Sequence, residues 1–525
     1  MHKWFMFADR RSPAAFWLGS TGIVLGVLLH IPPFLMARAM HYRMAGMPMG
    51  TPMLFGMACI LIGVMAAAYG LQPDAAAGDC GAVLERVVAP EEAPLTAWHW
   101  AACAALAIAL AVDIMKVSSL GFVIPGMRSE YRLSAAQVSV LPFAALTGAT
   151  LGSFIWGSLA DRYGRRATIL LAGVMFIGTS ICGAMPSFEW NVFMCFLMGA
   201  SAGGLLPVAY ALLAEIMPTQ HRGWSLVLVG GAGALGGYLA ASGFSALLQP
   251  YFGWRIMWFL NLPSGLLLIA LSPLIPESPR FLLHIGHPDA ARATLERFGA
   301  RMIAPAAADE APAGERDREL PARRGLPGTS MALSVAGLSW GLVNFGLLLW
   351  LPGELIAGGR DMGLAATLMT RSSVLAAPVV IFAAVLYSRW STKGALLVMT
   401  AITAAGVLAL TLQQSGLPAA ANPLLASVLL IVGSTGVIAI LLPYAAENYP
   451  LAVRGRATGW VAGCSKAGGL ICQGLGALAL VPALRLSSAV TAIAVLLSLF
   501  LIARFGHETR GRDLRQLERT FARSR

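Results

Sequence analysis

Apolar stretches of about 20 residues follow one another along almost the whole sequence of 525 residues, separated by shorter polar segments. A helix of this length crosses the hydrocarbon core of a bilayer, and in lipid a helix satisfies its own backbone hydrogen bonds. We therefore predict an all-α polytopic membrane protein with about fourteen transmembrane helices. The expected helices are 15–36 and 52–71, then 98–121, 137–159, 167–186, 190–214, 224–248 and 256–275, then 331–352, 369–387, 394–412, 423–446, 456–481 and 486–504.

Polar segments divide these helices into groups of two, six and six. The expected domains are an N-terminal transmembrane hairpin (1–75), a linker (76–97), a first six-helix half (98–276), a charged central loop (277–329), a second six-helix half (330–505) and a tail (506–525).

Composition agrees with this organisation. The sequence is 57% hydrophobic and 12% charged, with a mean hydropathy of +0.72, whereas soluble proteins carry about 25% charged residues. Its net charge of +12 does not indicate a nucleic-acid partner, because the cations lie in short loops and no basic surface is interleaved with aromatic residues. By the positive-inside rule, the loops around Arg162 and Arg222, the central loop and both termini are expected in the cytoplasm, which places the protein in the inner membrane.

The sequence lacks the patterns of a catalytic or metal site. Seven cysteines are scattered without a CxxC pair or a Cys/His spacing, so we interpret them as packing residues. A phosphate-binding loop and a nucleophile elbow are also absent from the sequence. We therefore expect no enzyme activity, no cofactor and no metal.

Three landmarks recur at a nearly constant offset. Glu447-Asn-Tyr-Pro follows Glu215-Ile-Met-Pro by 232 positions (447 − 215), and Glu508 follows Glu277 by 231 (508 − 277). Leu364 follows Leu133 by 231 (364 − 133), each leading into alanines. The two six-helix halves are therefore predicted to be duplicates, and transporters built from repeats bind substrate near the membrane midplane between them.

The segment Gly157-Ser-Leu-Ala-Asp161-Arg162-Tyr-Gly164-Arg165-Arg166 resembles the loop signature between helices two and three of the major facilitator superfamily. Glu215 to Gly223, Pro276 to Arg280, and Glu508-Thr-Arg-Gly511 resemble its sugar-porter-like branches, which include the metabolite:proton and aromatic-acid:proton symporters. The resemblance covers about residues 98–515 and implies a secondary transporter of a small solute.

The sequence also departs from several branches of that superfamily. The second-half counterpart of the loop signature, Ser388 to Lys393, has no carboxylate, and Gly230 to Gly237 lacks the proline of the antiporter signature. The helix around Asn344 lacks the paired glutamines of hexose carriers. These departures favour import by symport over efflux and disfavour a hexose. The first helix of the half offers Asp113-Ile-Met-Lys116 in place of the Asp-Gly-x-Asp of aromatic-acid carriers, so an aromatic acid is not implied.

The resemblance assigns a cytoplasmic gate to the charged loop residues. This gating set comprises Gly157, Asp161, Arg162, Gly164, Arg165, Arg166, Glu215, Arg222, Glu277 and Arg280 in the first half, and Glu447, Arg454, Glu508 and Arg510 in the second. We expect Asp161 to cap a helix of the other half, Arg165 or Arg166 to pair with Glu215, and Arg222 to pair with a carboxylate such as Glu277. The alternative is that they only set topology and form surface ion pairs worth under about 1 kcal/mol each.

Charges inside the predicted helices indicate where the transport chemistry lies, because a charge at bilayer depth is costly and usually functional. Asp113 is the candidate proton-coupling group, with Lys116 one turn later on the same helix face. Lys466 lies among small residues that allow close helix approach. We interpret the excess of lysine over aspartate as favouring an anionic substrate such as a carboxylate, although a static ion pair or a snorkelling lysine is the alternative for each. Asn344, which is 231 positions after Asp113, and Arg371 are further candidate substrate contacts.

The N-terminal hairpin is rich in methionine and histidine, with His30, Met36, Met40, His41 and Met44 among them. Thioether ligands suit Cu(I), but methionine also fills irregular gaps in a lipid-facing accessory hairpin. We expect the second role and no metal.

The sequence as a whole predicts a proton-coupled symporter of a small organic anion, acting as a monomer in the lipid bilayer. An exporter of the same fold, and a transporter-like solute sensor, are the alternatives.

Overall fold

The computed structural model describes residues 10–74, 94–300, 326–359, 361–413, 423–449, 451–480 and 484–510. Within these ranges the regular structure is helical, and the one isolated β-bridge joins Arg10 to Pro73. Among the described residues, thirteen helices are long and apolar enough to cross a membrane. A further long helix, α20 (Leu451–Ala477), carries Lys466 and Gln473 among its apolar residues. The prediction of an all-α polytopic protein is confirmed.

The N-terminal hairpin is a tightly packed pair of helices, α1 (Pro13–Leu28) and α3 (Thr51–Gly70), with α2 (Ile31–Met36) and η2 (Ala37–Met40) at its turn. A Cβ added at Gly26 would lie 2.5 Å from the carbonyl oxygen of Gly56, and one added at Gly19 would lie 2.5 Å from that of Gly63. The helices can approach this closely because the glycines have no side chains at the contact.

The first half contains six membrane-crossing segments, of which three are single helices and three are broken. In chain order its elements are α4 (Ala97–Tyr131), α5 (Ala135–Tyr163), α6 (Arg165–Gly178) with η3 (Thr179–Ala184), α7 (Phe188–Ala202) with α8 (Leu205–Ile216), α9 (Thr219–Phe252), and α10 (Ile256–Phe259) with α11 (Asn261–Leu271) and η4 (Ser272–Leu274).

The second half also contains six long segments, of which the first two are interrupted by π-helical turns. Its elements are α14 (Leu326–Gly341) with the π-helix η6 (Leu342–Leu348) and α15 (Leu349–Ala357), α16 (Met362–Ala376) with α17 (Val379–Val385) and the π-helix η7 (Leu386–Trp390), α18 (Thr392–Gln413), α19 (Pro423–Asn448), α20 and α21 (Leu484–Phe505). Between the halves lie α12 (Pro279–His284) and α13 (Pro288–Arg297), which belong to the expected central loop. Its residues 301–325 lie outside the described ranges.

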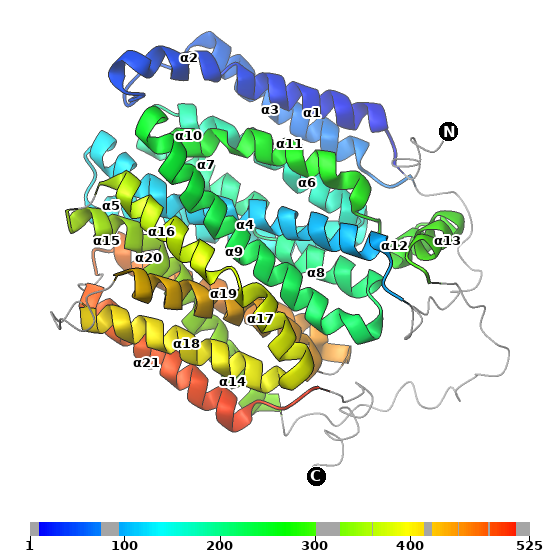
Figure 1. Ribbon diagram of the computed structural model, residues 1–525. Coiled ribbons are helices and arrows are strands. Elements are labelled where there is room, and N and C mark those ends of the chain that lie inside the picture. Colours follow the sequence, from blue (N-terminus) through cyan, green and yellow to red (C-terminus); the bar gives the residue numbers. More distant parts are fainter. Residues whose placement is uncertain are drawn as a thin grey trace, which may run out of the picture.

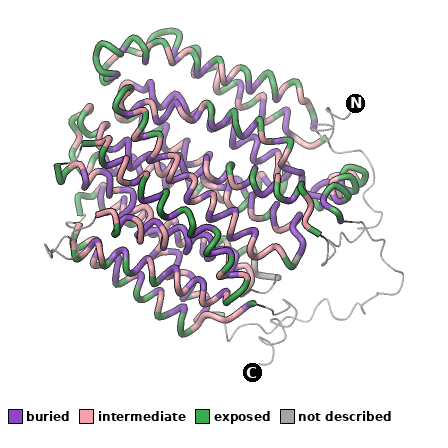
Figure 2. Tube along the Cα trace, in the orientation of Figure 1, coloured by how far each residue is buried: buried purple, intermediate pink, exposed green. Residues whose placement is uncertain are grey.

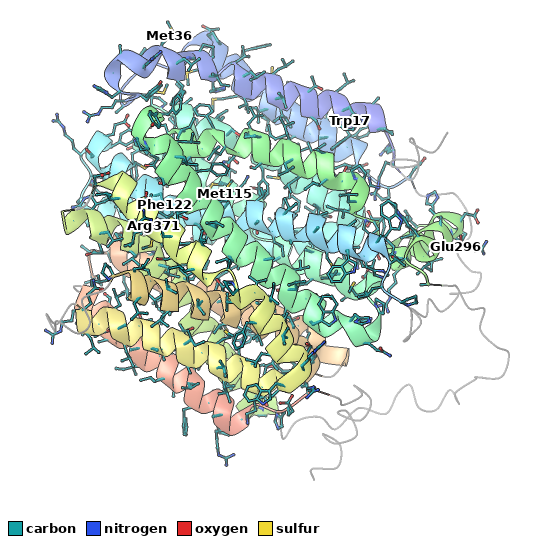
Figure 3. The ribbon with its side chains drawn as sticks, viewed as in Figure 1. Trp17, Met36, Met115, Phe122, Glu296 and Arg371 are labelled. Carbon is teal, nitrogen blue, oxygen red and sulfur yellow. The ribbon has the colours of Figure 1, made fainter. Side chains whose placement is uncertain are left out.

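Figure 1 shows the hairpin along one edge of the bundle, beside the first half and far from α18 and α21 of the second. It packs on α6 and η3. Its outer surface is exposed and apolar: Figure 2 colours much of it as exposed, and Met36, labelled in Figure 3, is 78% exposed. This surface suits lipid, whereas the inner surface belongs to the protein core.

The helices also extend beyond their predicted ends. Helix α4 continues to Tyr131 although Pro125 lies inside it, so the expected segment 98–121 was too short. One end of the bundle, on the right in Figure 1, contains the α5–α6 junction, the α8–α9 junction and α12. We call this end the motif side. The other end is the opposite side.

Candidate transport cavity and gating loops

A cavity of about 1210 Å³ lies between the two halves. From the first half it is lined by Asp113, Ser153, Tyr210, Glu215, Arg222 and Tyr238, from α12 by Arg280, and from the second half by Trp340, Asn344, Phe345, Ser434 and Lys466, among others. Because Glu215, Arg222 and Arg280 belong to the motif side, the cavity extends from the middle of the bundle to that side. This set of lining residues is called the central cavity below.

Asp113 faces this cavity from the middle of α4. Its side chain is buried, and its Oδ1 has no hydrogen-bond partner among the described residues. A buried polar atom without a partner is costly, so such atoms in native proteins call for an explanation. A proton or a bound solute would remove that cost.

Lys116, one turn after Asp113 on α4, is not among the residues that line the cavity. Its ammonium lies 3.2 Å from the ring centroid of Phe176 in α6, and its Nζ has no hydrogen-bond partner among the described residues. The cation therefore faces an aromatic ring inside the first half. The physical reason is that α4 is packed on both sides, and residue 116 falls on the side toward α6.

Lys466 lines the cavity from α20, as expected, and it also joins the two halves. Its ammonium donates hydrogen bonds to the carbonyl oxygens of Ala149 (3.2 Å) and Gly203 (2.9 Å) and to the hydroxyl of Ser153. An ammonium has three N–H donors, so these partners account for all of them. The first-half acceptors come from α5 and from the break between α7 and α8.

Two other sequence candidates separate in the structure. Asn344 lines the central cavity from η6, a π-helical turn of a kind that often marks functional sites. Arg371, labelled in Figure 3, lies exposed on α16 and is not among the residues that line the cavity. The sequence alone could not reveal this, because the side of α16 on which Arg371 lies depends on how the helix is rotated about its axis.

Sequence reasoning missed Trp340 and Phe345 of the cavity wall, whereas Tyr210 and Tyr238, which also line it, were weaker candidates from the sequence. Trp340 donates to the carbonyl oxygen of Ser434 at 2.9 Å, and its ring meets that of Phe345 edge-on at 5.5 Å. Tyr238 has a buried hydroxyl without a hydrogen-bond partner among the described residues. A position in a cavity leaves no signature in hydropathy, so only the packed structure reveals Trp340 and Phe345 and places Tyr238 in the wall.

The expected carboxylate cap exists, but Glu277 supplies it rather than Asp161. Glu277 Oε1 accepts from the backbone N–H groups of Arg165 (2.7 Å) and Arg166 (3.2 Å), which begin α6. Gly164, with φ of +91°, makes room, because a Cβ there would lie 2.6 Å from the Glu277 carboxylate. The cap therefore belongs to the same half as its helix.

Asp161 and Glu215 both approach the guanidinium of Arg165. The distances are 3.4 Å to Asp161 and 3.3 Å to Glu215, so the expected Arg165–Glu215 pair is present. The side chain of Asp161 is 80% exposed, as expected of a residue at an open end of the bundle. Arg162 is exposed beside it.

The second half repeats the carboxylate cap with Glu508. Its carboxylate accepts from the backbone N–H (2.9 Å) and the hydroxyl of Thr392, which begins α18, and from the hydroxyl of Ser391. Burial raises its pKa, but these hydrogen bonds and the N–H of Arg510 outweigh that effect and lower the pKa to about 2. Glu447 accepts from the hydroxyl of Thr509 at 2.6 Å. The side chain of Arg454 lies outside the described residues.

Helices α5 and α20 touch near the opposite side and separate toward the motif side. A Cβ added at Gly474 would meet Phe143, and one added at Gly469 would meet Leu146. One added at Gly157 or at Gly459 would meet nothing within 4 Å. The two helices run antiparallel, and Ser153 of α5 lies opposite Lys466 of α20. About one to two turns further toward the motif side, Gly157 of α5 therefore lies at the level of Gly459 of α20. Of these two glycines, Gly459 lines the central cavity.

The methionines of the hairpin do not form one cluster. Met36 and Met40 are exposed, whereas Met44 and Met53 are buried. Within the described residues no group of three or more His, Cys, Asp or Glu side chains could hold a metal ion. The structure adds no evidence for the copper alternative.

Comparison with known proteins identifies the fold family. Residues 106–472 match the Major Facilitator Superfamily. The chain belongs to this superfamily, and it is therefore a transporter.

Two relatives and one solved structure illustrate its place there. The chain is 28% identical over 408 residues to the "Putative niacin/nicotinamide transporter NiaP" of Bacillus subtilis, covering 77% of this chain and 94% of that protein. It is 26% identical over 408 residues to the "4-hydroxybenzoate transporter PcaK" of Acinetobacter baylyi, covering 74% of this chain and 86% of that protein. Its fold resembles the xylose transporter XylE from E. coli with a TM-score of 0.63 at 16% identity, covering 80% of this chain and all of the other.

Proposed function

We propose that this transporter carries a small aromatic carboxylate together with a proton. The observation that carries the proposal is that one carboxylate, Asp113, and one ammonium, Lys466, line the same cavity between the halves. A carboxylate that changes its charge and a cation that attracts an anion are the two parts that proton-coupled anion transport needs.

Asp113 is proposed as the proton carrier. Its Oδ1 lies buried without a hydrogen-bond partner among the described residues. Burial of a carboxylate with no donor or cation bound to it favours its protonated, neutral form. As Asp113 faces the cavity, that proton exchanges with whichever side the cavity opens to.

Lys466 is proposed as the anion contact. Its three hydrogen bonds all go to α5 and to the break after α7, so a substrate carboxylate has to replace at least one of them. Replacement would loosen a contact between the halves. Substrate binding and the movement of the halves are then linked by the same ammonium group.

The aromatic character of the substrate follows from the cavity wall and the relatives. Trp340, Phe345 and Tyr238 offer ring surfaces in the same cavity that Lys466 lines. The relatives are named for niacin, nicotinamide and 4-hydroxybenzoate, which are single aromatic rings with small polar substituents. Asn344 is proposed to hydrogen-bond that polar group.

The loop cations favour a cytoplasmic position for the motif side, with both termini there and the protein in the inner membrane. The gating set, with its two carboxylate caps, is proposed to control access from that side.

The test is proton-linked uptake into proteoliposomes that contain the purified protein. Nicotinate, 4-hydroxybenzoate and the neutral isostere nicotinamide serve as probes, and a pH-sensitive dye follows the protons. We expect the wild type to accumulate an acid with proton uptake, and Asp113→Asn to exchange the acid but not to accumulate it. Lys466→Gln should weaken the apparent affinity for the two acids by at least tenfold and change that for nicotinamide little. Lys393→Gln is the matched control, because Lys393 is half-buried at the start of α18 and does not line the cavity.

Two outcomes contradict the proposal. If Asp113→Asn accumulates the acid with an unchanged pH dependence, the coupling assignment is wrong. If nicotinamide and nicotinate respond equally to Lys466→Gln, the anion assignment is wrong. Proton flow opposite to that of the acid would instead identify an exporter.

A further inference from the structure

Arg10, the residue that leads into the hairpin, reaches the gating loops. Its side chain is 3% exposed, and its Nη2 lies 2.6 Å from Oε2 of Glu277. Its Nη1 donates to the carbonyl oxygens of Leu71 (3.1 Å) and of Tyr163. One guanidinium therefore joins the start of α1, the end of α3, the end of α5 and the carboxylate that caps α6.

The second half has a guanidinium at the corresponding place. Arg510 donates to the carbonyl oxygens of Ser388 (3.1 Å) and Trp390 (3.0 Å), which end η7. Trp390 stands directly before the η7–α18 junction, as Tyr163 stands directly before the α5–α6 junction. In each half, an arginine and a carboxylate together hold the turn between the second and third helices.

The source of that arginine differs between the halves. Glu508 is followed two residues later by Arg510, whereas Glu277 is followed two residues later by Pro279. Pro279 has no charged side chain, and it is the first residue of α12. The first half therefore lacks its own arginine at this position, and Arg10 of the hairpin occupies the site instead.

A second anchor fixes the other end of the hairpin to the same half. Glu130 accepts from the backbone N–H groups of Met44 (2.7 Å) and Ala45 (3.0 Å) and from Arg255 (2.7 Å). The N–H of Gly46 donates to the carbonyl oxygen of Pro186 at 3.0 Å. Held at both membrane sides, the hairpin moves with the first half as one body.

From this arrangement we propose that Arg10 is a positioning residue of the transport gate, supplied by the hairpin to complete the α5–α6 junction. Glu277 holds the backbone of Arg165, and Arg165 holds Asp161 and Glu215 at the cavity mouth. Closing the motif side brings this junction toward α20, because the halves of such carriers move against each other. A junction that is already ordered loses less conformational entropy when it closes.

The effect on the cycle has a definite direction. All bonds of Arg10 described above lie within the first half and its hairpin, so they do not by themselves favour one state. Without the bonds of Arg10, the α5–α6 junction is less ordered in the open state and becomes ordered only when the motif side closes. Removing Arg10 should therefore reduce the population that is closed at the motif side, and with it the maximal transport rate. The KM should change little, because Arg10 does not line the central cavity.

The experiment compares Arg10→Ala with Arg11→Ala in the full-length protein. Arg11 is the matched control, because it is the next residue, is exposed, and contacts Gln72 and Tyr69 rather than Glu277. Ser118→Cys in the cavity wall reports access to each side. It is labelled with a membrane-impermeant maleimide in intact cells and in inverted vesicles, and mass spectrometry of that peptide excludes the native cysteines.

We expect Arg10→Ala to shift the ratio of the two labelling rates at least fivefold toward access from the motif side, and to lower the maximal rate about tenfold at an unchanged KM. Arg11→Ala should match the parent. Glu277→Gln should shift the ratio in the same direction, and the double variant should add nothing further, since both act through one contact. Arg10→Lys, which keeps the charge but not the planar fork, should fall between. It also serves if Arg10→Ala does not fold.

Labelling ratios for Arg10→Ala and Arg10→Lys equal to that of Arg11→Ala would overturn the inference, as would additive effects with Glu277→Gln. The labelling assay uses no substrate, so this inference and the proposed aromatic acid can fail separately.

Discussion

The carboxylate of Glu508 accepts a hydrogen bond from the backbone N–H of Thr392 at 2.9 Å. In the first half, Glu277 accepts one from Arg165 at 2.7 Å. Each carboxylate follows the sixth membrane-crossing segment of its half and caps the third, where the exposed N–H groups and the helix dipole favour an anion. The two caps express in three dimensions the offset of 231 residues between these glutamates.

The Glu508 cap predicts a pH-dependent contribution to stability. Its pKa in the folded protein, about 2, lies below the ordinary value of 4.5. A depressed carboxyl pKa stabilises the fold above the ordinary value, and this contribution is lost as the pH falls from about 4.5 through 2. Glu508→Gln should therefore lower the Tm in detergent by about 3 °C at pH 7 and by less at pH 3.5.

The control for this prediction is Glu296→Gln. Glu296 is exposed on α13 (labelled in Figure 3), so this variant should leave the Tm unchanged at both values of pH. A Tm difference between wild type and Glu508→Gln that grows on acidification would contradict the cap.

Gly157→Val tests closure between α5 and α20. The added side chain meets open space in this structure, so folding and the Tm should not change. When the motif side closes, the valine would occupy the space that Gly459 approaches. Transport should then fall more than tenfold, while Ser158→Val, on the neighbouring exposed position, keeps the wild-type rate. An active Gly157→Val protein would show that the two helices do not meet there.

Ser153→Ala tests the competition for the Lys466 ammonium. Removing one of three acceptors leaves a donor free for a substrate carboxylate, and a hydrogen bond contributes about 0.5–1.5 kcal/mol. We expect the apparent Kd for 4-hydroxybenzoate to fall by about two- to tenfold, measured by equilibrium binding. Thr147→Ala is the control, because its hydroxyl donates only locally to Phe143. Weaker binding by Ser153→Ala would mean that Ser153 contacts the substrate itself.

Glu130→Ala tests the anchor on the opposite side. The variant leaves the fully buried Arg255 without its carboxylate, and breaking a buried ion pair costs about 3–5 kcal/mol. The protein should lose most of its thermal stability in a detergent melting experiment. Glu189→Ala, at an exposed position of the same side, should melt like the wild type. Equal melting of the two variants would rule out this ion pair as an anchor.

Much of the fold could be predicted because each membrane helix is encoded by a continuous stretch of the sequence. An apolar run long enough for a bilayer predicts a helix wherever it stands, and the repeated glutamates reveal the duplication without any contact being known. The end of α4 was predicted too early, because hydropathy marks the apolar part of a helix and α4 continues through the more polar residues up to Tyr131.

The site was predicted only in part, since helix rotation is not recorded in the sequence. Asp113 and Lys466 stood out as charges inside apolar runs, and both line the cavity. Lys116 and Arg371 stood out for the same reason, yet one lies over Phe176 and the other on the outside of α16.

The sequence by itself determined that this chain is a two-halved membrane transporter of the facilitator type, because hydrophobic length and repeated motifs are properties of the order of residues. Only the tertiary structure decided which charges meet. Arg10 and Glu277 are 267 positions apart, and this separation in the sequence gives no indication that the two side chains form an ion pair. Packing of the hairpin on α6 brings these two together, because it places the start of α1 beside the α5–α6 junction that Glu277 caps.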